Sequence, residues 1–138
     1  MAKQRNSARL VKIVATHPRR LSHVLNTVLS ASNYDGVNVL RNLNEPVGSE
    51  LFEKYDCVFN GGLLEHVFNF PVALKNCLEM VKVGGHFITI TLANAQFGHG
   101  FYQFSPELFY SALCARTAFW LNSCFCVSKP VVLCQKAR

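Results

Sequence analysis

The sequence lacks several features that mark well-known classes of protein. Its 138 residues contain no apolar run close to the roughly 18 residues needed to span a bilayer, and its start lacks the apolar centre of a secretory signal. None of its six cysteines forms the CxxC spacing that is typical of zinc sites. We therefore expect a cytoplasmic protein with reduced cysteines, without a membrane segment and without a metal site.

Acidic residues are missing from both ends of the chain. The first acid is Asp35, six lysines and arginines precede it, and the stretch Cys114 to Arg138 contains no acid at all. The net charge is +6, and the amino end carries much of the excess. A basic stretch can bind phosphate backbones, so nucleic acid is one candidate partner. The alternative is a solvated basic face without a partner.

Half of the residues are hydrophobic, which is enough for one domain with a core over residues 1–138. Residues 1–9 are polar, and we expect them to be frayed. The run Leu10–Ala15 is strand-like, and apolar residues then recur with helical spacing over Leu21–Leu29. Val37–Leu40 follows a turn signal and predicts another short strand.

The stretch Tyr55–Leu92 predicts a complete strand, helix and strand. Cys57–Phe59 is a short apolar run bounded by polar and glycine residues, which is typical of a buried strand. A helix should then end at Gly84-Gly85, before a β-branched strand over His86–Leu92. Such a unit is nearly always parallel and right-handed. The apolar stripe of its helix would consist of Leu74, Cys77, Leu78 and Val81.

These residues resemble a known family. The segment Asp56–Val67, DCVFNGGLLEHV, with the later Val83-Gly84-Gly85, is similar to the second half of a class I S-adenosylmethionine-dependent methyltransferase domain. Asn94–Leu108 resembles the loop and helix that follow the fifth strand there, and the whole resemblance covers Val37 to about Leu113. It implies an α/β fold, namely an incomplete Rossmann-like, mostly parallel sheet flanked by helices. It also implies S-adenosylmethionine as the cofactor.

The resemblance assigns roles to residues that follow the two central strands. The alternatives from the residues alone are an ordinary strand-to-helix turn, a structural histidine that anchors a loop, and a polar loop. A histidine suits proton transfer near neutral pH because its unperturbed pKa is about 6.5. The implied cofactor-binding residues are Asn60, Gly61, Gly62 and Glu65, the catalytic ones His66 and His99, and the substrate-binding ones Asn94, Tyr102 and Gln103.

The first part of the chain departs from the family pattern. A class I domain opens with a strand that ends in a glycine-rich turn, because only glycine lets the backbone approach the cofactor closely. Here Ala15 is followed by Thr-His-Pro-Arg-Arg, without a glycine. The next strand, whose acid would hold the ribose, is missing or compressed, and Asn42 stands where the family usually carries an acid.

The last part of the chain, 114–138, is also atypical of the family. With permitted codons, a two-base shift lets the residues from Phe119 onward encode a peptide that resembles the family's next strand, so a frame-shifted tail is one hypothesis. Sequencing the locus tests it. As the sequence stands, Cys124–Val127 and Val131–Cys134 could form a terminal hairpin around Lys129-Pro130.

Three interpretations of function follow from these observations. The first is a truncated S-adenosylmethionine-dependent methyltransferase-like protein with a small-molecule or saccharide-type methyl acceptor. The second is a basic α/β module that binds RNA or another acidic partner without catalysis, with Phe97, Phe101, Tyr102 and Phe104 as aromatics that could stack on bases. The third is a degenerate gene product without function. A sheet edge left exposed by the missing unit would favour homo-oligomers.

Overall fold

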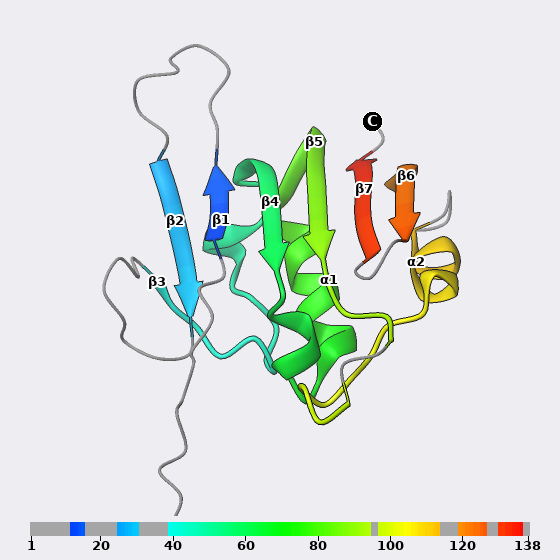
Figure 1. Cartoon of the computed structure of the whole chain (residues 1–138). Coiled ribbons are helices and arrows are strands. Elements are labelled where there is room, and N and C mark those ends of the chain that lie inside the picture. The colour runs from blue at the N-terminus through cyan, green and yellow to red at the C-terminus, as the bar shows by residue number, and fades with distance from the viewer. Residues whose placement is uncertain are drawn as a thin grey trace, which may run out of the picture.

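The computed structural model describes residues 12–15, 25–30, 39–94, 97–113, 119–126 and 130–136. These residues form strands, two α-helices and two short 3-10 helices, η1 and η2 (Figure 1). In chain order the elements are β1 (Lys12–Ala15), β2 (Leu25–Ser30), β3 (Val39–Leu40), η1 (Ser49–Leu51), β4 (Tyr55–Gly61), η2 (Leu64–His66), α1 (Phe70–Met80), β5 (Val81–Ile90), α2 (Pro106–Ala112), β6 (Phe119–Cys126) and β7 (Pro130–Lys136).

The central sheet has the strand order β4-β5-β7-β6. β4 and β5 are parallel, as the sequence predicts, and they are joined by α1. β7 is antiparallel to both of its neighbours, so β6 runs in the same direction as β4 and β5. Three of the four strands are therefore parallel to one another. The predicted fold class, an incomplete Rossmann-like α/β sheet, is confirmed.

A second group of strands lies beside β4 and contains one clear correction. β1 pairs with β2 antiparallel, from Lys12 opposite Val28 to Ala15 opposite Leu25, and β2 pairs with β3 in parallel. The helix predicted over Leu21–Leu29 is thus wrong for Leu25–Ser30, which is strand β2. The segment includes the β-branched Thr27 and Val28, and its pairing with β1 outweighs a spacing that also suits a helix.

A second correction concerns the end of α1. We predict from sequence that this helix continues to Gly84-Gly85, but it ends at Met80, and Val81 is the first residue of β5. The backbone amides of Glu53 and Lys54 bond the carbonyls of Glu79 and Met80, and this bonding satisfies the end of the helix. The chain can then enter the sheet at once, because Val81 pairs with Tyr55.

The two glycines instead lie inside β5, where the pairing register with β4 shifts. Tyr55 pairs with Val81, but Cys57 pairs with His86, so residues 82–85 bulge out of the ladder. A Cβ at Gly85 would lie 2.7 Å from the carbonyl oxygen of Asp56, which explains why glycine is needed there.

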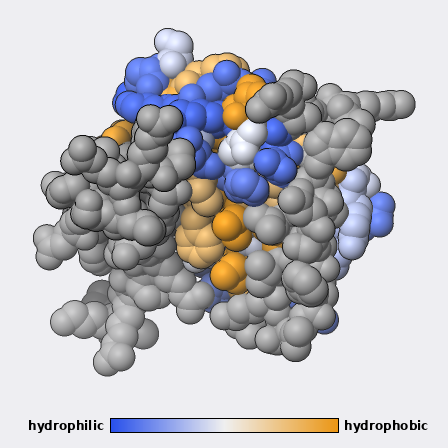
Figure 2. All heavy atoms as spheres, turned by 90° about the horizontal axis from the view of Figure 1, so that it is seen from above, coloured by the Kyte–Doolittle hydropathy of each residue, from blue (hydrophilic) through white to orange (hydrophobic). Residues whose placement is uncertain are grey.

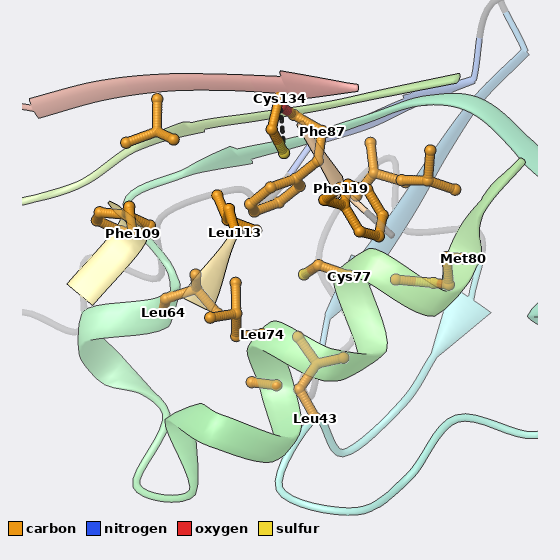
Figure 3. Packing of buried hydrophobic residues seen from close by; sticks show 14 of the residues in the cluster. Leu43, Leu64, Leu74, Cys77, Met80, Phe87, Phe109, Leu113, Phe119 and Cys134 are labelled. Carbon is orange, nitrogen blue, oxygen red and sulfur yellow. Dashed lines mark hydrogen bonds between the residues drawn. The ribbon is translucent and has the colours of Figure 1, made fainter. Parts of the chain in front are cut away.

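The hydrophobic core lies between one face of the central sheet and the helices α1 and α2 (Figure 3). From α1, Leu74, Cys77 and Met80 point toward the sheet, where Phe87 and Cys134 meet them. Residues of β5 alternate accordingly, because each second side chain points to the helices and is buried. The other face is less covered: Phe59, Ile88 and Ile90 are only half-buried.

The terminal hairpin is confirmed, with strands longer than the sequence predicts. β6 and β7 pair from Phe119 opposite Lys136 to Cys126 opposite Pro130. β7 lies inside the sheet, between β5 and β6, so the atypical tail belongs to the core of the domain. Val132 and Cys134 are fully buried. The frame-shift hypothesis stays a prediction.

Figure 2, which views the molecule from above, shows hydrophobic atoms in the middle of the face, with hydrophilic atoms next to them and at the margin. Among the helices that the structure describes, none is long and apolar enough to cross a membrane.

Candidate active site at the carboxyl ends of β4 and β5

The candidate site lies where β4 and β5 both end. Because the two strands are parallel, Gly61 and Ile90, at their carboxyl ends, pair with each other at one edge of the sheet. Open α/β sheets bind ligands outside this edge. Of the residues predicted from the resemblance as cofactor-binding, Asn60 and Gly61 are the last two residues of β4, and Gly62 and Glu65 follow the strand. All four therefore lie at this edge of the sheet.

Asn60 is buried and organises the turn after β4. Its side-chain amide donates a hydrogen bond to the Thr89 hydroxyl over 2.6 Å, and its side-chain oxygen accepts one from the Leu63 amide over 3.0 Å. Both polar groups of the side chain are therefore used inside the protein. Asn60 holds β4, β5 and the start of η2 together, whereas Gly61, the next residue, is half-buried at the edge.

Glu65 is the buried charged residue of the site. It lies in η2 and is only 1% exposed, and its Oε2 accepts a hydrogen bond from the Thr91 hydroxyl over 3.1 Å. Gly62 makes room for this carboxyl group, since a Cβ at Gly62 would lie 3.0 Å from Oε1. Gly62 also has a φ of +87°, which glycine adopts without strain. The predicted residues Gly62 and Glu65 are thus in contact range of each other.

The loop after β5 returns to the main chain of Glu65. The backbone amides of Phe101 and Tyr102 donate to the carbonyl oxygen of Glu65 over 2.6 and 3.3 Å. Gly100 permits this approach, because a Cβ there would lie 2.6 Å from the same oxygen. The main chain therefore fixes the loop, and with it the position of His99, against η2.

The two histidines predicted as catalytic come together. The ring centroids of His66 and His99 are 4.8 Å apart, with the rings edge to face at 69°. His66 is exposed and His99 is half-buried. One potential ligand atom from each of Glu65, His66 and His99 lies within 4.8 Å of the others. The sequence predicted both histidines separately, but it did not predict that they meet beside the carboxylate.

The three residues predicted as substrate-binding differ in their environments. Asn94 and Gln103 are exposed in the loop between β5 and α2. The Tyr102 hydroxyl donates to the carbonyl oxygen of Phe68 over 2.5 Å, and its ring packs against Phe70 with centroids 4.9 Å apart. Tyr102 therefore attaches the loop to the start of α1.

Sequence analysis missed the two threonines of the site. Thr89 and Thr91 are both buried, and they hold Asn60 and Glu65 respectively. In the sequence they were only part of a β-branched strand pattern. Their alternation with isoleucines did carry a signal, because a polar residue on the buried face of a strand needs a partner.

Three aromatic side chains are exposed beside the site: Phe68, Phe97 and Phe101. Phe68 and Phe101 contact each other edge to face, with ring centroids 5.9 Å apart. Of the aromatics predicted as base-stacking, Phe104 is instead buried in the core. The exposed set is therefore partly different from the predicted one.

The opposite side of the site differs from the family pattern in strand direction. In Figure 1, β1 lies beside β4 but runs opposite to it, so the carboxyl end of β1 is at the other edge of the sheet. Residues 16–20 follow β1, at the position where the family has its glycine-rich turn, and they lie outside the described residues. Among the residues that the structure describes, the site is built from β4, η2, the end of β5 and the loop 97–104.

Comparisons with known proteins agree with the fold. The chain is similar to the CMeT domain of the citrinin polyketide synthase, with a TM-score of 0.53 and 6% identity, covering 72% of this chain and 32% of that one. It is also similar to a protein of Bacillus halodurans C-125 assigned as a methyltransferase, with a TM-score of 0.53 and 12% identity, covering 66% and 48%. No protein-family model and no curated protein matches the sequence.

These similarities concern the fold. They confirm that the fold of the chain is similar to the fold of a methyltransferase. The chain spans about a third of the length of the first of these proteins and about half of the second. It has the methyltransferase-like fold in incomplete form.

Proposed function

We propose that the chain is a methyltransferase-like domain that binds S-adenosylmethionine at the carboxyl ends of β4 and β5. One observation carries the proposal: a small, half-buried Gly61 and the buried pair of Gly62 and Glu65 stand at the sheet edge where this fold binds its ligand. These residues fit one side of the cofactor, the side that the fourth strand forms in the family. When bound, the cofactor supplies an activated methyl group.

His66 and His99 would then take the role of proton acceptors for a methyl acceptor that carries a proton. Their exposure supports this role, since His66 is open to solvent and His99 is half-buried at the same edge. A small molecule or saccharide is the acceptor class that we propose, with Asn94 and Gln103 as exposed polar contacts. We also propose that the protein works in the cytoplasm, where thiols such as Cys77 and Cys134 stay reduced.

Calorimetric titration of the full chain with S-adenosylmethionine and S-adenosylhomocysteine tests the proposal. We expect micromolar binding, on the order of −8 kcal/mol. Gly61→Val should weaken it at least about tenfold, because the new side chain fills space at the sheet edge. Val83→Ala is the matched control, since Val83 is exposed at the amino end of β5. A folded protein that gives no heat with either compound would exclude this function.

A second candidate function is binding of single-stranded RNA. It is favoured by the exposed Phe68, Phe97 and Phe101, because aromatic faces stack on bases of any sequence. Retention on a generic oligonucleotide at low salt, lost in Phe68→Ala/Phe101→Ala, would support it. If the wild-type chain is not retained at low salt, this candidate is wrong.

A further inference from the structure

The cluster Glu65, His66 and His99 combines donor groups that bind metal ions. One carboxylate oxygen and two imidazole nitrogens converge, with one atom from each residue within 4.8 Å of the others. Two residues come from η2, and the third comes from the loop after β5. The fold therefore brings these three residues together, although His99 is far from the other two in the sequence.

The cluster is held in place by its surroundings. Thr91 donates a hydrogen bond to Oε2 of Glu65, which orients the carboxyl group. The amides of Phe101 and Tyr102 bond the Glu65 carbonyl oxygen, which fixes the loop that carries His99. Metal sites need such outer contacts, because they set the direction of the ligands before the ion arrives.

The donor set and its exposure define the kind of ion. Two histidines and one carboxylate are a common ligand set for Zn²⁺ sites that keep a fourth position for water. Here Glu65 is buried, whereas His66 is exposed, so the cluster opens to solvent on the histidine side. Tetrahedral zinc with bonds of about 2.0–2.1 Å would need ligand atoms roughly 3.4 Å apart. The ligand atoms now lie within 4.8 Å of one another, and rotation of the His66 side chain, which lies at the surface, would shorten this distance.

We propose that Glu65, His66 and His99 form a binding site for Zn²⁺ with an open fourth position. The site does not depend on S-adenosylmethionine binding, and a histidine nitrogen that binds zinc is not a proton acceptor, so this site is an alternative to the role proposed above for His66 and His99. The sequence pattern gives no sign of the site because His99 is remote from His66 in the chain. An ion there would also bridge η2 and the loop 97–104. The folded protein should therefore gain stability when zinc is added.

The test is a competition titration of the full chain with Zn²⁺ against a chromophoric chelator, with Co²⁺ absorption as a report on the ligands. We expect one equivalent of zinc, and a Co²⁺ spectrum with tetrahedral bands but without thiolate charge transfer. Glu65→Gln keeps an oxygen for Thr91 but removes the charge. Each of the variants Glu65→Gln, His66→Ala and His99→Ala should weaken zinc binding about 100-fold or more. Loss of a residue that only supports a ligand costs roughly 10–100-fold in metal affinity, so loss of a ligand itself should cost at least as much.

His86→Ala is the matched control, because His86 is a half-buried histidine on β5 outside the cluster. It should bind zinc like the wild type. The melting temperature, measured with and without zinc, separates lost binding from lost folding: a folded variant shows a transition that zinc no longer shifts. Wild-type affinity in His66→Ala/His99→Ala, an equal loss in His86→Ala, or a thiolate spectrum with Co²⁺ would each overturn the proposal.

Discussion

Gly100 controls how closely the loop 97–104 approaches η2. Its φ is +72°, and a Cβ would lie 2.6 Å from the Glu65 carbonyl oxygen, a backbone atom that cannot move aside alone. Gly98 is a natural comparison, because its φ is +77° but a Cβ there would meet nothing within 4 Å. The two glycines thus share a positive φ, and they differ in the space that a Cβ would find.

We predict that Gly98→Ala costs about 1–2 kcal/mol of unfolding free energy, the price of a positive φ for alanine. Gly100→Ala should cost about 1–3 kcal/mol more, because the hydrogen bonds from Phe101 and Tyr102 to Glu65 must lengthen as well. Urea unfolding of both variants measures the difference. Equal losses would show that the close approach at Gly100 does not matter for stability.

Cys77 and Cys134 behave as buried hydrophobic residues. Burial raises the pKa of each thiol from 9.0 to about 12, and hydrogen bonding to the backbone opposes this only in part. The Cys134 sulfur lies 3.6 Å from the Phe87 carbonyl oxygen (Figure 3). The folded state binds these two protons more tightly than the unfolded state does. The contribution of the two thiols to the unfolding free energy is therefore fully present below pH 9, and it is lost as the pH rises toward 12.

The alkaline loss should amount to about 1.4 kcal/mol per pH unit for each thiol within this range. In Cys77→Ala, the slope of unfolding free energy against pH above 9 should fall by one such contribution, although the variant is less stable below pH 9, where the truncation of a buried side chain is the only effect. Denaturant unfolding at several pH values gives the slopes. An unchanged slope would mean that Cys77 titrates alike in both states.

At the scale of elements, Asn76 attaches α1 to the segment that precedes β4. Its side-chain oxygen accepts from the Val47 amide over 3.0 Å, and its side-chain nitrogen donates to the carbonyls of Leu43 and Glu45 over 3.2 and 2.8 Å. The side chain is buried, 1% exposed, in the middle of the helix. One polar residue therefore satisfies three backbone groups of a segment without regular structure.

Asn76→Ala should lower the unfolding free energy by about 2–4 kcal/mol, because buried backbone groups lose their partners. Lys75→Ala is the control, since Lys75 is the exposed neighbour on the same helix and should change stability by less than about 0.5 kcal/mol. Thermal or urea unfolding distinguishes the two. A loss below about 1 kcal/mol in Asn76→Ala would indicate that water replaces these bonds.

Elements were predictable from sequence where local chemistry alone decides them. The start of α2 is an example of local chemistry, because the Ser105 hydroxyl accepts from the Glu107 amide and Pro106 is the first residue of the helix. Prediction failed where distant pairing decides. Leu25–Ser30 becomes a strand because β1 lies beside it, and Val81 leaves the helix because Tyr55 pairs with it.

For the whole molecule, the same distinction applies to the site. The resemblance of Asp56–Val67 placed Gly62, Glu65 and His66 correctly at the end of β4, since they follow it in the chain. The meeting of His66 with His99 depends on hydrogen bonds between the Glu65 carbonyl and the later loop. No local pattern encodes a contact between main-chain atoms so far apart, so the sequence could name both histidines but not their contact.

The atypical tail is an integral part of the central sheet. β7 lies between β5 and β6 in the sheet, and its Val132 and Cys134 are buried against the helices. Lys136 at its end donates to the Val81 carbonyl over 3.0 Å and pairs with Glu53 at 2.9 Å. Loss of the tail would therefore expose the helix-facing side of β5, where Phe87 is fully buried. It would also remove β7, the strand that pairs with β5.

We predict that a chain ending at Leu113 does not unfold cooperatively, whereas a chain ending at Lys136 unfolds like the full protein. A large core side chain such as Phe87 contributes about 1.5–3 kcal/mol when buried, and the shorter chain also loses the buried Phe119, Val132 and Cys134 and the β5–β7 ladder. Together these losses are comparable with the net stability of a domain, about 5–15 kcal/mol. Near-ultraviolet circular dichroism during urea titration reports the transition. A cooperative transition in the shorter chain would mean that residues 114–136 are dispensable, and that the core between α1 and β4–β5 is sufficient.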